Sequence, residues 1–151
     1  MRASFLGTGL LLLSCALAPS PSQAQTQAPN DAELYFISPR DGQALRGPFT
    51  VRFGLSNMGV TQAGNSWPNS GHHHLLVDVA EPLDPGEPIP SGNSYQHFGG
   101  GQTETRLQLP PGRHTLQLVL GDAEHKPFAP MVASRKITVH VLPPTERRSR
   151  R

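Results

Sequence analysis

The stretch Phe49-Thr50-Val51-Arg52-Phe53-Gly54-Leu55 decides the fold class of this chain. Its apolar side chains occupy every second position, and polar residues or glycine fill the positions between them. Because successive side chains of a strand point to opposite faces, this period of two collects the apolar side chains on one face. The stretch therefore predicts a β-strand with one face against a core and the other toward solvent.

The same alternation recurs along the chain, and helical periodicity is absent after residue 24. Residues 80–94 contain four prolines and no such pattern, which predicts a loop with at most a short edge strand. Six clear strands, or seven with that edge strand, predict an all-β fold, an immunoglobulin-like antiparallel β-sandwich. The expected strands cover residues 34–38, 49–55, 73–79, 103–109, 114–121 and 136–141.

The beginning of the chain has the features of a signal peptide. Arg2 precedes an apolar run over residues 5–17, and Ser22-Gln23-Ala24 offers small residues for cleavage. The run is too short to span a bilayer well, so we expect residues 1–24 to be removed and the mature chain to have no transmembrane segment. The protein is then periplasmic or secreted. Leu12-Leu13-Ser14-Cys15 offers an alternative, a lipobox in which Cys15 becomes a lipidated N-terminus.

The expected domain covers residues 32–142, after a linker over 25–31. Between Asp31 and Leu142 there are eight Lys/Arg and ten Asp/Glu, so the domain is slightly acidic and presents no basic face for nucleic acid. The positive charge of the chain lies in residues 143–151, which we expect to form a disordered basic tail. Cys15 is the only cysteine, so the mature chain forms no disulfide and no thiolate metal site.

Five histidines fall in three loops that the sandwich is expected to bring to one end. The triplet His72, His73 and His74 lies at the exit of the loop that leads into the third strand, His97 lies just before the fourth strand, and His125 lies in the loop after the fifth. His72 and His74 share a strand face about 6.5–7 Å apart at Cα, so both imidazoles can bind one ion. His73 points the other way, either to cap the core or to join His97 and His125 in a separate pocket. The predicted ligands are His72, His74, His97 and His125, with His73, Asp122, Met58 and Met131 as secondary candidates.

The methionines bear on the identity of the metal. Met58 and Met131 lie in loops expected at the histidine end, and a thioether beside imidazoles favours copper over calcium or magnesium. We therefore expect copper ahead of zinc and no organic cofactor, although each methionine can instead plug the end of the sandwich. Because neutral imidazoles bind metals in competition with protons, metal affinity is predicted to fall below about pH 6.

Two other functions compete with metal binding. A metal-free module for protein interaction or envelope assembly would present aromatic anchors to an envelope protein partner, and Trp67, Tyr95, Phe98 and Phe128 supply them. An enzyme ranks third, because the sequence contains neither a nucleophile elbow nor paired acid–base carboxylates. We assign no catalytic residue and expect binding rather than catalysis.

Several segments resemble an uncharacterised family of exported bacterial proteins, domain of unknown function 4399. They are ISPRDG at 37–42, FTVRFGL at 49–55, GHHHLLVD at 71–78, HFGGGQTET at 97–105 and PPGRHTLQLVLGDAEHKPF at 110–128. The resemblance covers residues 32–142 and implies no established activity. A looser likeness to small periplasmic copper carriers implies a sandwich that binds copper. Those carriers have a histidine at the mature N-terminus, and this chain has none near Gln25.

Overall fold

The structure is a computed structural model, and it describes residues 24–145. The expected signal peptide except for its last residue, the lipobox cysteine Cys15 and residues 146–151 of the tail lie outside the described residues. Within 24–145 the chain forms nine strands and no helix. It consequently contains no helix that is long and apolar enough to cross a membrane.

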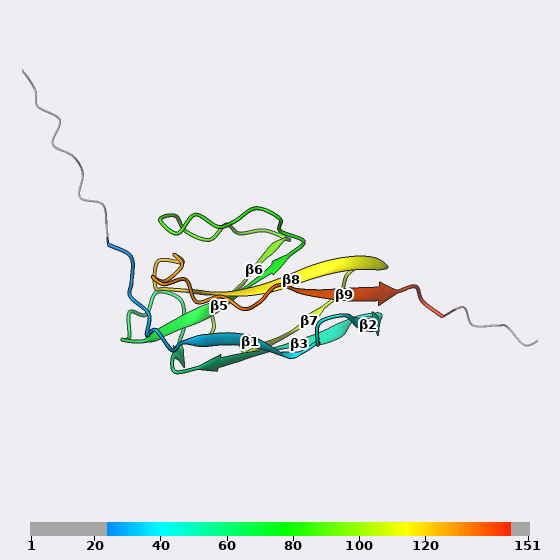
Figure 1. Ribbon diagram of the computed structural model, residues 1–151, viewed down its shortest axis with the longest axis horizontal. Helices are drawn as coiled ribbons and strands as arrows, with labels where there is room; N and C mark the ends of the chain where they lie inside the picture. The colour runs from blue at the N-terminus through cyan, green and yellow to red at the C-terminus, as the bar shows by residue number, and fades with distance from the viewer. Residues whose placement is uncertain (1–23, 146–151) are drawn as a thin grey trace, which may run out of the picture.

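The strands form two packed sheets, which confirms the immunoglobulin-like sandwich (Figure 1). One sheet has the order β1-β3-β7, and the other has the order β2-β9-β8-β5-β4 with β6 paired to β5. The bounds are β1 Glu33–Ser38, β2 Gln43–Arg46, β3 Phe49–Ser56, β4 Gly59–Val60, β5 Ser70–Val77, β6 Tyr95–Phe98, β7 Glu104–Leu107, β8 Gly112–Gly121 and β9 Ile137–Leu142.

Three short strands depart from the prediction of six or seven antiparallel strands. The strands β2, β4 and β6 were not expected. Two of them form parallel pairs: β2 pairs with β9, and β4 pairs with β5. Strands of two to four residues are too short to show a convincing period of two, so only their partners reveal them. The longer strands lie close to their expected positions.

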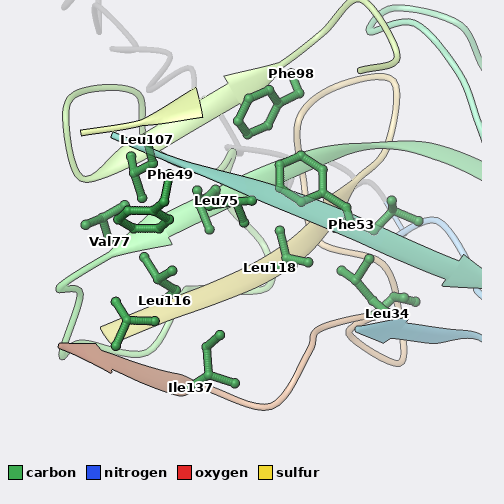
Figure 2. Close-up of a cluster of buried hydrophobic side chains, with 14 of the residues drawn as sticks. Leu34, Phe49, Phe53, Leu75, Val77, Phe98, Leu107, Leu116, Leu118 and Ile137 are labelled. Carbon is green, nitrogen blue, oxygen red and sulfur yellow. The ribbon is translucent and has the colours of Figure 1, made fainter. Parts of the chain in front are cut away.

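The core lies between the sheets and is built from alternate residues of the long strands. In β3, Phe49, Val51 and Phe53 are buried, while Thr50 and Arg52 are exposed, as the alternation predicted. Figure 2 shows the side chains from β3, β5 and β8 meeting in the space between the strands. The largest cluster includes Leu34, Phe49, Val51, Phe53, Leu75, Val77, Phe98, Leu107, Leu116, Leu118, Leu120 and Val139.

The outer face of the larger sheet is also covered. Leu76 of β5 and Val119 of β8 form a second, smaller cluster with Val79 and Ile89 of the following loop. The loop between β5 and β6, green in Figure 1, runs on the side of β8 that faces away from β1 and β3. A backbone hydrogen bond holds the loop in this position, because Ile89 N donates to His125 O at 2.8 Å. Both faces of β5 are therefore buried, and the histidine triplet lies within that strand.

A buried histidine organises the opposite end of the sandwich. In β8, His114 Nδ1 lies 2.7 Å from Asp78 Oδ2, and His114 Nε2 lies 2.9 Å from Pro110 O. Asp78 also accepts a hydrogen bond from Thr115 N at 2.8 Å. Burial alone would lower the pKa of His114, but the hydrogen bonds to Asp78 and the Pro110 carbonyl outweigh it and raise the pKa.

Replacing Asp78 by asparagine is expected to lower the pKa of His114. Asparagine keeps the shape and tolerates the positive φ of 56° at this position, but it removes the negative charge that favours the imidazolium. Because the folded pKa is raised, this pair stabilises the fold below about pH 6.5, and the stabilisation is lost as the pH rises through the folded pKa. An NMR titration of the His114 ring measures the shift, and an unchanged pKa in Asp78→Asn would contradict the assignment.

Candidate metal centre

Two histidines of the triplet lie side by side on the outer face of β5. His72 and His74 are separated by one residue and share the face of Leu76, and they are 0% and 1% exposed. Sequence analysis placed the triplet at the exit of a loop, but β5 begins at Ser70, so all three histidines lie within the strand. β5 is hydrogen-bonded to β8 on one side and to β6 and β4 on the other. The positions of both rings are therefore set by a central strand.

His97 joins the pair through strand pairing. In the register of β5 with β6, His97 lies directly opposite His74, so both side chains leave the sheet on the same face. We expected His97 in a loop before the fourth strand, whereas it belongs to the four-residue strand β6. Tyr95-Gln96-His97-Phe98 is too short for its strand character to be recognised without its partner.

His125 completes a cluster of four rings. It follows β8 in a tight turn at φ 66°, and its ring centroid lies 4.9 Å from that of His72 and 4.8 Å from that of His97. The other centroid distances are 4.9 Å for His72–His74 and His72–His97, 5.1 Å for His74–His97 and 6.1 Å for His74–His125. The four predicted principal ligands thus lie together, and we call them the histidine cluster.

The nitrogen atoms of three cluster members, His72, His74 and His97, fit a shared metal ion. One ring nitrogen from each of His72, His74 and His97 lies within 4.8 Å of the others, and the two Nε2 atoms of His72 and His74 are 3.0 Å apart. Two imidazole nitrogens bound to one ion at about 2.0–2.1 Å are roughly 2.9 Å apart at a right angle and roughly 3.4 Å apart at a tetrahedral angle. The observed separation lies within this range.

One further observation supports the fit. Gly121 of β8, opposite His72 in the register, leaves the space that the rings occupy. A Cβ atom at Gly121 would lie 2.8 Å from His74 Nε2 and 3.5 Å from His72 Nε2. The absent side chain of Gly121 therefore lets the two rings approach each other.

Burial favours the neutral form of the imidazoles of His72, His74 and His97. It lowers the pKa of His72 to about 4, with smaller effects from His125 and His97, and that of His74 to about 3, with smaller effects from the neighbouring histidines. The pKa of His97 is also lowered, first by burial and then by His125. Neutral imidazoles carry the free lone pair that a metal needs, so these rings are ready to bind metal at neutral pH.

His73 lies apart from the histidine cluster. It faces the core between the sheets, where its ring centroid is 5.1 Å from that of Phe53. It is 0% exposed, and neither ring nitrogen has a hydrogen-bonding partner among the described residues. Burial lowers the pKa of His73 to about 4. Of the two alternatives for this residue, the structure favours a core position over a pocket shared with His97 and His125.

Asp122 holds the turn that carries His125. Its Oδ1 accepts hydrogen bonds from the backbone N–H groups of Glu124 and Lys126, both at 2.9 Å. Its Oδ2 accepts one from Thr26 Oγ1 at 2.6 Å. Both carboxylate oxygens are thus engaged in positioning the turn. Thr26 belongs to the segment 25–31, expected as a linker, and this segment also exchanges backbone hydrogen bonds with Ala129.

The methionines and most of the proposed aromatic anchors have other environments. Met58 packs against the core between the sheets, and Met131 is 38% exposed beside Leu76 and Leu83. Phe98 and Phe128 are buried in the core, and Tyr95 is half-buried beside Leu76. Among the four aromatic residues, Trp67 alone is largely exposed, at 70%. It belongs to the loop between β4 and β5.

Two glycines shape the site, and the sequence indicated one of them. The run Gly99-Gly100-Gly101 beside His97 predicts close approach of the backbone, and a Cβ atom at Gly99 would lie 2.3 Å from His97 Cε1. Gly121 ends β8, and no local pattern of the sequence indicated its role.

The comparisons with known proteins concern the family and the fold. No curated protein shows significant similarity to the chain. An endo-beta-1,4-mannanase from Thermotoga petrophila is 17% identical with a TM-score of 0.46, over 76% of this chain and 20% of that chain. The fibronectin(III)-like modules of CbhA from Clostridium thermocellum are 16% identical with a TM-score of 0.36, over 76% of this chain and 99% of that chain. The chain thus spans about a fifth of the mannanase.

The family match covers the strands that build the histidine cluster. The model of the family described as "Domain of unknown function (DUF4399)" matches residues 51–142, which is more than half of the chain. This range runs from β3 to the end of β9 and includes all four cluster histidines. The chain belongs to the family of the domain of unknown function 4399.

Proposed function

We propose that this protein is an exported metal-binding module whose ligands are His72, His74, His97 and His125. One observation carries the proposal: two fully buried imidazoles direct their Nε2 atoms at each other, 3.0 Å apart, beside two further histidine rings. In the absence of metal these two Nε2 atoms form one hydrogen bond, which engages the lone pair of only one of them, whereas a shared ion engages the lone pairs of both. The signal-peptide pattern of residues 1–24 supports export to the periplasm.

Copper is the preferred ion, in its divalent state. The cluster offers imidazole nitrogen from every member, and among divalent first-row metals such sites bind Cu(II) more tightly than Zn(II). A thioether ligand beside the imidazoles would favour the reduced ion, Cu(I), but Met58 packs against the core and Met131 lies beside Leu83, which removes that argument. Zinc is the second choice, because neutral imidazole is also a common zinc ligand.

The lowered pKa values change the expected pH dependence of binding. A histidine at its ordinary pKa would lose metal below about pH 6. With the pKa of His72 at about 4 and that of His74 at about 3, protons compete with the metal for these two rings only at lower pH. Binding is therefore expected to persist at pH 5.5.

The function is tested by titrating the full chain, produced without a polyhistidine tag, with Cu(II) and then Zn(II) at neutral pH in a calorimeter. We expect one ion per chain with a dissociation constant below about 1 μM, a binding free energy near −8 kcal/mol or stronger. The double substitution His72→Ala/His74→Ala removes both buried donors and is expected to abolish this binding. His140→Ala is the matched control, because His140 is an exposed histidine of β9 outside the cluster.

The outcomes distinguish specific metal binding by the histidine cluster from nonspecific metal binding by exposed histidines. Binding that survives in His72→Ala/His74→Ala, or that is lost equally in His140→Ala, would contradict the proposal. No measurable heat with either ion would do the same and would favour a metal-free interaction module. This second function is favoured by the exposure of Trp67 in the loop before β5. An exposed aromatic side chain of this kind can become buried against a partner, and aromatic anchors are common in protein interfaces.

A further inference from the structure

The four histidines of the cluster differ in burial and in how firmly they are held. His72 and His74 are buried on the central strand β5, which has hydrogen-bonded neighbours on both sides. His97 is exposed and lies on β6, whose strand partner is β5 alone among the described strands. His125 is half-buried in a turn between strands. The side of the cluster formed by His72 and His74 is therefore rigidly held and shielded from solvent, whereas the side formed by His97 faces solvent.

The donor set carries no negative charge of its own. Asp122, the nearest carboxylate in this part of the fold, uses its oxygens for Thr26 and for the backbone of the turn. His72 Nδ1 and His74 Nδ1 have no acceptor among the described residues, and such acceptors normally make a ligating imidazole more basic. An ion held only by neutral imidazoles keeps its full charge, so an incoming donor of higher charge or basicity competes well for it.

We infer, on the basis of the proposed metal-binding function, that the cluster hands its ion to an acceptor by ligand exchange on the His97 side. A nitrogen donor of the acceptor forms a bond to the ion as the bond to His97 Nδ1 or Nε2 breaks, and the imidazole leaves as a neutral group. The bond to His125 breaks next, and the buried His72 and His74 release the ion last. The ion keeps its oxidation state, and no electron is transferred. The protein is thus a metal carrier.

Transfer kinetics test this inference. The full chain, loaded with one equivalent of Cu(II), is mixed with increasing excesses of ethylenediaminetetraacetate, and loss of the visible absorption of the bound ion is followed by stopped flow. We expect the transfer rate to rise with the concentration of the chelator, because the chelator attacks the bound ion. We expect His97→Ala to weaken binding by about 10- to 100-fold and to transfer faster, whereas His140→Ala behaves like the unchanged chain.

The outcomes distinguish this inference from the proposed function. A transfer rate that is independent of chelator concentration would overturn exchange while leaving metal binding intact. So would a His97→Ala variant that loses binding as completely as His72→Ala, provided that its circular dichroism spectrum shows the fold retained. A His97→Ala variant that transfers at the rate of His140→Ala would likewise overturn it. Absence of Cu(II) binding by the unchanged chain would remove both proposals together.

Discussion

Replacing Gly121 by alanine is expected to lower the affinity of the chain for Cu(II) by about 100-fold, the upper range for changes that misplace a metal ligand. The added Cβ atom would lie 2.8 Å from His74 Nε2 and 3.1 Å from His74 Cδ2, closer than real side chains approach. The His74 ring cannot move away easily, because it is 1% exposed and packed against the rings of His72 and His97. The two Nε2 atoms would therefore no longer reach a shared ion. Calorimetric titration with Cu(II) measures the loss.

Gly59→Ala is the matched control for this substitution. Gly59 lies on β4, paired with β5 at Ser70, and a Cβ atom there would lie 3.5 Å from that of Ser70, an ordinary contact. Neither Gly59 nor Gly121 has a positive φ, so alanine strains the backbone at neither position. The Gly59→Ala variant should bind Cu(II) as the unchanged chain does. Equal affinities in both variants would show that the nitrogen atoms do not converge at Gly121.

The metal-free protein is expected to lose stability steeply in acid. The unfolded chain takes up protons on its histidines near pH 6.5, whereas burial keeps His72 and His73 neutral in the fold down to about pH 4 and His74 down to about pH 3. The contribution of these three histidines to stability is therefore complete above pH 6.5 and falls as the pH approaches 4. His73 alone accounts for about 3 kcal/mol of this loss at pH 4. Urea unfolding at pH 7 and pH 4, followed by circular dichroism, measures it.

His73→Leu isolates the contribution of the core histidine. Leucine has a similar volume and no unpaired nitrogen, so the difference in unfolding free energy between pH 7 and pH 4 should shrink by about 3 kcal/mol. Stability at pH 7 should not decrease, because a buried polar group without partners is replaced by an apolar one. Cu(II) binding should stay unchanged, since His73 faces away from the cluster. An unaltered acid sensitivity in this variant would contradict the assignment of His73 to the core.

The alternation of apolar residues was sufficient to predict the long strands and the two faces of the triplet. β3, β8 and β9 lie where the period of two predicted them, and the separation of His73 from His72 and His74 follows from the same rule. These are local properties of the chain, because one strand determines which of its own side chains share a face.

The location of the cluster depends on contacts that no local pattern encodes. His97 lies opposite His74 because β6 pairs with β5, and a four-residue strand reveals its partner only in the folded sheet. The prediction that loops gather the histidines at one end was reached by the wrong route, since His72, His74 and His97 all lie within strands. The burial of His72 and His74 could not be foreseen either, because rings from two other parts of the chain, those of His97 and His125, pack against them.

The division of β5 into two faces has a consequence for how such proteins can diverge. The side chains of Leu75 and Val77 hold the two sheets together, whereas those of His72 and His74 point away from that interior. Substitutions on one face leave the packing on the other almost untouched. A lineage with this scaffold can therefore change the residues at positions 72 and 74 without refolding the sandwich. Membership of this family does not by itself imply a histidine cluster, and the residues at these positions have to be read from each member's own sequence.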